Sequence, residues 1–116
     1  MTDVTIYHNP RCSKSRETLA LVNAEQHNIE IIKYLETPPS IATINTLLKQ
    51  LGFDSARQLM RTKDALYKEL NLDAEQDETA LIAVLHAHPA LIERPIVVAN
   101  GKAAIGRPPA SVLTIL

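Results

Sequence analysis

The chain has 116 residues, of which 46% are hydrophobic and 22% charged, a composition that fits one globular domain and excludes a disordered protein. Twelve basic and thirteen acidic side chains leave a net charge of −1, so no overall field draws the protein to nucleic acid or anionic lipid. A single cysteine excludes an internal disulfide, and neither a leader-like N-terminus nor an apolar run of about 18 residues occurs, so we expect a soluble cytoplasmic protein.

The first part of the chain predicts a strand, a helix and a second strand. Val4–Tyr7 is β-branched and aromatic, and it ends before the turn-forming pair Asn9-Pro10. The composition from Ser13 to about Gln26 favours a helix, and Ile29–Tyr34 favours a second strand. A helix between two strands implies a right-handed crossover and a parallel pair.

The middle of the chain predicts helices. Ser40 suits the N-cap of a helix that Gly52 would end, and the apolar residues between them recur at helical spacing. Short helical segments are expected at Arg57–Met60 and Asp64–Leu70, followed by a longer helix from about Asp77 to His88.

The last part predicts a hairpin and a final helix. Pro95–Ala99 is typical of a strand, Asn100-Gly101 of a two-residue turn and Lys102–Ile105 of an antiparallel partner, with a helix after Arg107-Pro108-Pro109. The order βαβ, helices, ββα is that of an α/β thioredoxin-like fold. We therefore expect one domain over residues 1–116, with a four-stranded mixed sheet and a helical insertion at about 40–89 between the second and third strands.

The one cysteine, Cys12, lies between the first predicted strand and the first predicted helix. The unpaired N–H groups of a helix N-terminus favour a thiolate there, and neighbouring basic residues add positive charge. These neighbours are Arg11, Lys14 and Arg16, with His8 four residues upstream. Each role has an alternative on the residues alone. Cys12 could be a small buried core residue rather than a reactive thiolate, and His8 could be only structural rather than a partner of the thiolate.

Other chemistries are disfavoured by residue spacing. Ser15 stands where a Cys-x-x-Cys pair would have its second thiol, so an oxidised Cys12 needs an external thiol. Thr18 stands where a cysteine phosphatase loop would have its arginine. His86 and His88 would point to different faces of a helix, so we expect no metal site.

The segment His8–Arg16 resembles the active-site segment of the glutaredoxin-coupled arsenate reductases, the ArsC family. Further segments similar to the family's follow in family order: Tyr34–Pro39, Arg57–Arg61, Tyr67–Leu70, His88-Pro89, Arg94–Val98 and Gly106–Pro108. Together they extend from Val4 to about Leu113, and the family has the thioredoxin-like fold.

The resemblance implies roles for particular residues. It makes Cys12 the catalytic nucleophile. It implies three oxyanion-binding arginines, Arg61, Arg94 and Arg107, whose guanidinium forks suit a tetrahedral anion. It implies supporting roles for His8 and Ser15, which help to keep the thiolate ionised, and for Pro95 as a cis-proline that faces the cysteine. Each arginine could instead be a solvated surface side chain.

The resemblance also implies a reaction and its partners. The Cys12 thiolate attacks arsenate, glutathione attacks the adduct, and glutaredoxin removes the glutathione as arsenite departs. We therefore expect arsenate, glutathione as co-substrate and glutaredoxin as partners, with no tightly bound cofactor, no nucleic acid and no membrane. Two alternatives remain, an ArsC-like thiol oxidoreductase with another substrate and an Spx-like redox-sensing regulator that binds RNA polymerase. Ser15 argues against the second, because Spx-like proteins resemble a Cys-x-x-Cys version of the motif.

Overall fold

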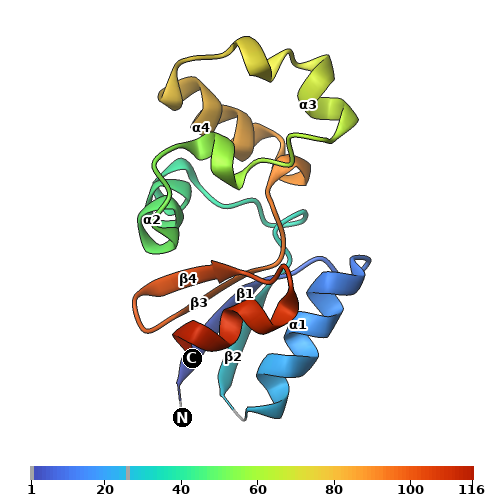
Figure 1. Cartoon of the computed structure of the whole chain (residues 1–116), viewed down its shortest axis with the longest axis vertical. Helices are drawn as coiled ribbons and strands as arrows, with labels where there is room; N and C mark the ends of the chain where they lie inside the picture. Colours follow the sequence, from blue (N-terminus) through green and yellow to red (C-terminus); the bar gives the residue numbers. More distant parts are fainter. Residues whose placement is uncertain (1, 26) are drawn as a thin grey trace. The chain divides into compact units, whose positions relative to one another are not determined.

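The computed structural model describes residues 2–25 and 27–116 and is shown in Figure 1. The chain forms two compact units, one of Met1–Thr37 with Arg94–Leu116 and the other of Pro38–Glu93. Within the described residues, no helix combines the length and apolar character needed to span a bilayer.

The first unit is built on a four-stranded mixed sheet. Its strands are β1 (Asp3–Tyr7), β2 (Asn28–Ile32), β3 (Ile96–Ala99) and β4 (Lys102–Ile105), in the order β2-β1-β3-β4. β1 runs parallel to β2 and antiparallel to β3, and β4 is antiparallel to β3. This arrangement confirms the predicted thioredoxin-like sheet.

One face of this sheet carries α1 (Ser13–Ala24) and the C-terminal 3-10 helix η4 (Pro109–Ile115), which lie next to each other in Figure 1. Side chains alternate between the faces of a strand, so β1 directs Val4 and Ile6 to the same side. The core that they form is completed by Val22, Val97, Ala99 and Val112. Full burial of one such valine or isoleucine contributes about 1.5–3 kcal/mol to folding.

Most expected boundaries in this unit are confirmed, but β2 ends at Ile32 and not at Tyr34, because the chain turns after Ile32. α1 begins at Ser13, as predicted; Gln26, the expected last residue of that helix, lies outside the described residues. The hairpin turn at Asn100-Gly101 has φ values of 55° and 74°, the left-handed backbone that this residue pair tolerates. The final helix differs from an α-helix, because it adopts the tighter 3-10 form over its seven residues.

Gly106 follows β4 and leaves space for two buried neighbours. A Cβ atom at this position would lie 2.8 Å from Pro95 Cγ and still closer to Thr18 Oγ1. We therefore expect Gly106→Ala to lower the free energy of unfolding by about 1–3 kcal/mol through overpacking, measured by urea denaturation. Adding Thr18→Ala removes the nearest atom and should restore part of the loss. An unchanged stability of Gly106→Ala would contradict this account of the packing.

The second unit is helical. α2 (Ile41–Leu51) starts at the predicted N-cap, where the Ser40 side chain accepts a hydrogen bond from Thr43 N–H, and ends at Gly52 with φ 73°. The further helices are η1 (Ala56–Leu59), α3 (Ala65–Glu69), η2 (Leu72–Ala74), α4 (Glu78–Ala87) and η3 (Pro89–Leu91). α4 packs against α2, η1 and η3. The helices expected near 57–60, 64–70 and 77–88 are thus present, the first as a 3-10 turn.

Arg57, the first residue of the family-like segment Arg57–Arg61, has a structural role. Its guanidinium donates hydrogen bonds to the Tyr67 hydroxyl and to the carbonyls of Leu72 and Glu75. Tyr67 in turn donates to Asp73 at 2.7 Å. The side chain therefore ties η1 to the segment that joins α3 to α4.

Candidate active site

The loop between β1 and α1 positions Cys12. Its turn is closed by a hydrogen bond from Cys12 N–H to the Asn9 carbonyl at 3.0 Å, and the Asn9 side chain accepts from Arg11 N–H at 3.0 Å. Cys12 is the N-cap residue of α1, and its carbonyl accepts from Arg16 N–H. The thiol is partly exposed, which rules out the alternative of a sealed core cysteine.

His8 and Ser15 are buried beneath this loop. His8 Nδ1 lies 2.6 Å from Ser15 Oγ, and Ser15 Oγ also accepts from Asn9 N–H at 3.0 Å. Burial, together with the charges of Lys33 and Arg16, lowers the pKa of His8. The pair therefore connects the end of β1 to the first turn of α1.

Arg107 and Arg94 bring positive charge to the sulfur. Arg107 Nη2 lies 3.7 Å from Cys12 Sγ, and Arg107 Nε donates to the Arg94 carbonyl at 2.8 Å. The second contact fixes the orientation of the guanidinium plane. Arg94 Nε is buried and has no hydrogen-bond partner among the described residues. An unpaired buried donor of this kind costs about 1–3 kcal/mol.

The peptide bonds beside both arginines are cis. The Arg94-Pro95 bond confirms the expected cis-proline, and the Arg107-Pro108 bond is a second one that no feature of the sequence indicated.

The pKa of Cys12 lies below that of an ordinary thiol. Burial of the sulfur is the largest single influence and raises the pKa, but four weaker influences together outweigh it. These are the backbone N–H groups of Ser15 and Lys14 and the charges of Arg94 and Arg107. Both N–H groups belong to the first turn of α1, where the helix dipole also favours negative charge. The contribution of the helix N-terminus is therefore as expected. The helping charges, however, belong to Arg94 and Arg107 rather than to the basic sequence neighbours of Cys12.

This lowered pKa predicts the pH dependence of alkylation. The thiolate is the reactive form, so the rate with iodoacetamide rises as the pH passes through the pKa. We expect the midpoint for the folded protein to lie below that of the same protein in denaturant, and Arg94→Gln to move it upward because one favourable charge is lost. A midpoint equal to or above that of the denatured protein would contradict the described electrostatics.

Arg61 lies in the helical unit. Its N–H donates to the Leu91 carbonyl at 2.8 Å, and its guanidinium pairs with Asp64 at 3.2 Å. Its place in an oxyanion site stays a prediction. Cys12, His8, Ser15, Arg94, Pro95 and Arg107 all belong to the first unit.

Comparison with known proteins places this geometry in a family. The ArsC family pattern matches residues 7–115. The Escherichia coli K12 protein named "Uncharacterized protein YfgD" is 60% identical over 97% of this chain and 96% of its own length. A protein of Neisseria meningitidis serogroup A named "Arsenate reductase" is 50% identical over the full length of both chains.

A solved structure agrees with these sequence matches. The "Arsenate reductase from Vibrio cholerae" is 54% identical, with a TM-score of 0.96 over 99% of this chain and 98% of that one. The matched region includes the cysteine loop, both cis-proline segments and the whole helical unit. This chain therefore belongs to the ArsC family.

Proposed function

We propose that this protein is an arsenate reductase in which Cys12 is the nucleophile and glutathione and glutaredoxin supply the external thiols. The observation that carries the proposal is the position of Arg107 Nη2, 3.7 Å from a thiol whose pKa is lowered. The names of the Neisseria and Vibrio relatives support arsenate as the substrate.

The arginines suit a tetrahedral dianion. A guanidinium offers paired donors that fit two oxygens, and a unit charge about 5 Å from an anion contributes roughly 3 kcal/mol at an effective dielectric of 20, before desolvation. The Arg107 guanidinium already donates a hydrogen bond to the Arg94 carbonyl, so it loses little side-chain entropy when an anion binds. The buried Nε of Arg94 has no hydrogen-bond partner among the described residues, which supports a role in which it donates to a bound anion. The role of Arg61 as a third oxyanion ligand rests on the family resemblance alone and stays a prediction.

The proposed chemistry balances with two thiols. The Cys12 thiolate attacks arsenic, so a sulfur–arsenic bond forms and an arsenic oxygen leaves as water. A glutathione thiolate then attacks the Cys12 sulfur; a disulfide forms, the sulfur–arsenic bond breaks, and its electron pair reduces As(V) to As(III). Glutaredoxin takes the glutathione by thiol–disulfide exchange and frees Cys12. External thiols are required because the chain has one cysteine.

The supporting residues act on the nucleophile. Ser15 contributes its N–H to the thiolate, while its hydroxyl joins His8 to the loop backbone. We assign these residues the role of holding the loop in the conformation that exposes and ionises the sulfur.

A reconstitution with purified components tests the proposal. Arsenite should form from arsenate when the protein, glutathione and glutaredoxin are all present, and the rate should fall to background when any one is omitted. Arsenite formation no faster than without the protein would overturn the proposal. If Cys12 still exchanged with glutathione disulfide in that case, the alternative of a thiol oxidoreductase with another substrate would replace it.

A further inference from the structure

Basic side chains collect around the Cys12 loop although the whole chain has a net charge of −1. Four exposed cations belong to this cluster: Arg11, Lys14, Arg16 and Lys33. None of the four is an arginine of the proposed oxyanion site. The charges that lower the pKa of Cys12 come from Arg94 and Arg107, so ionisation of the thiol does not account for the cluster.

Two of these cations are engaged within the protein. Arg16 Nη1 donates to the Pro10 carbonyl at 2.9 Å and so braces the loop. Lys14 Nζ lies 3.6 Å from Glu17 on the same helix. The side chains of Arg11 and Lys33 have no hydrogen-bond or ion-pair partner anywhere in residues 2–25 and 27–116. These two therefore retain their full charge for a ligand.

The backbone places these two unpaired cations on neighbouring elements. Arg11 directly precedes the cysteine. Lys33 directly follows β2, whose last residue Ile32 pairs with Tyr7 and accepts a hydrogen bond from His8 N–H at 2.8 Å. Adjacent strands are about 4.8 Å apart, so Lys33 leaves the sheet next to the start of the loop. Its charge reaches His8, whose pKa it helps to lower.

We propose that Arg11 and Lys33 bind the carboxylates of the thiol co-substrate, so that Cys12 reacts preferentially with anionic thiols and disulfides. The identity of that co-substrate rests on the function proposed above. An extended tripeptide spans roughly 10 Å. A tripeptide with a carboxylate on each side of its thiol can therefore contact Arg11 and Lys33 while its sulfur reaches Cys12. The site thereby selects its reductant by charge.

Disulfide exchange without arsenate isolates this step. The Cys12 thiolate attacks one sulfur of a small disulfide; a mixed disulfide forms, the original S–S bond breaks, and one small thiolate leaves with its electron pair. Three probes differ in charge: oxidised glutathione is anionic, 2-hydroxyethyl disulfide is neutral and cystamine is cationic. Intact-protein mass spectrometry gives the rate of mixed-disulfide formation for each.

We expect Arg11→Gln and Lys33→Gln each to slow the reaction with oxidised glutathione about two- to fivefold, the range for one exposed charge pair. The rate with the neutral probe should stay the same, and the rate with cystamine should rise. Arg11→Lys keeps the charge and should retain the wild-type rates. Added salt should reduce the differences, because it screens exposed charges.

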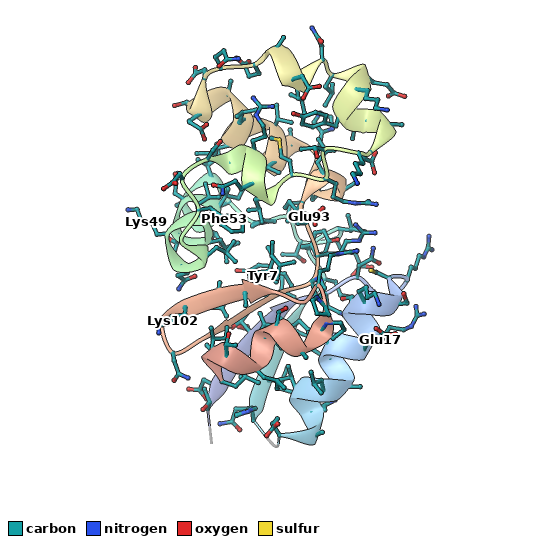
Figure 2. The ribbon with its side chains drawn as sticks, viewed as in Figure 1. Tyr7, Glu17, Lys49, Phe53, Glu93 and Lys102 are labelled. Atoms are coloured by element: carbon teal, nitrogen blue, oxygen red, sulfur yellow. The ribbon has the colours of Figure 1, made fainter. Side chains whose placement is uncertain are left out.

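Lys102→Gln is the matched control, because it removes one exposed lysine from the same unit at the hairpin end of β4. Figure 2 shows Lys102 at that end, away from Glu17 on α1. Equal changes for all three probes, or an effect of Lys102→Gln as large as that of Lys33→Gln, would overturn the proposal. Because no arsenate is present, this outcome is independent of whether the protein reduces arsenate.

Discussion

Cys12→Ser is expected to abolish arsenate reduction completely, to the rate measured without protein. A serine hydroxyl stays protonated near neutral pH, and the chain holds no second thiol that could form the sulfur–arsenic bond or the mixed disulfide. Colorimetric or chromatographic measurement of arsenite under the reconstitution conditions gives the rate.

The Cys12→Ser variant should keep the fold, because the side chain is only partly buried and the loop is closed by backbone hydrogen bonds. Circular dichroism and urea denaturation check this. Residual arsenite formation above background by a correctly folded Cys12→Ser protein would remove Cys12 from the mechanism.

Arg107→Ala is expected to lower kcat/KM for arsenate by about a hundred- to a thousandfold, the range for loss of one preorganised donor to an anionic reacting group. Two effects combine. The donor nearest the sulfur disappears, and the loss of its charge raises the pKa of Cys12. Steady-state kinetics at several pH values separates them, because the pKa contribution shrinks at high pH.

Two further variants make the Arg107 result specific. Arg107→Lys keeps the charge but loses the planar fork that contacts both Cys12 and the Arg94 carbonyl, so its activity should be intermediate. Lys102→Gln removes a cation far from the loop and should match the wild type. An Arg107→Ala protein with wild-type kcat/KM would show that this guanidinium does not act on the substrate.

Local signals were sufficient for most of the fold. The Ser40 N-cap and the Gly52 stop act within a few residues of the helix that they delimit, and the structure has them as predicted. The same is true of the Asn100-Gly101 turn, because its positive φ values are a property of those two residues. Capping and turn chemistry of this kind can be predicted without knowledge of tertiary contacts.

The site depends on contacts that local patterns do not encode. Cys12 and Arg107 are 95 residues apart in sequence, and their proximity could be expected only through the family resemblance. The contact of Arg107 Nε with the Arg94 carbonyl and the cis bond before Pro108 had no sequence signal. The charges that lower the pKa of Cys12 belong to Arg94 and Arg107 and not to its basic sequence neighbours. Adjacency to Cys12 in the sequence does not ensure that a long basic side chain turns toward the sulfur.

Bound arsenate should protect Cys12 from alkylation by iodoacetamide, measured with no reducing thiol present and at constant ionic strength. If a thiolate and guanidinium groups together form the oxyanion site, the rate with iodoacetamide should fall as arsenate is added and level off at saturation, and Arg107→Ala should need a much higher arsenate concentration for the same protection. An alkylation rate independent of arsenate concentration in the wild-type protein would show that no oxyanion binds at Cys12.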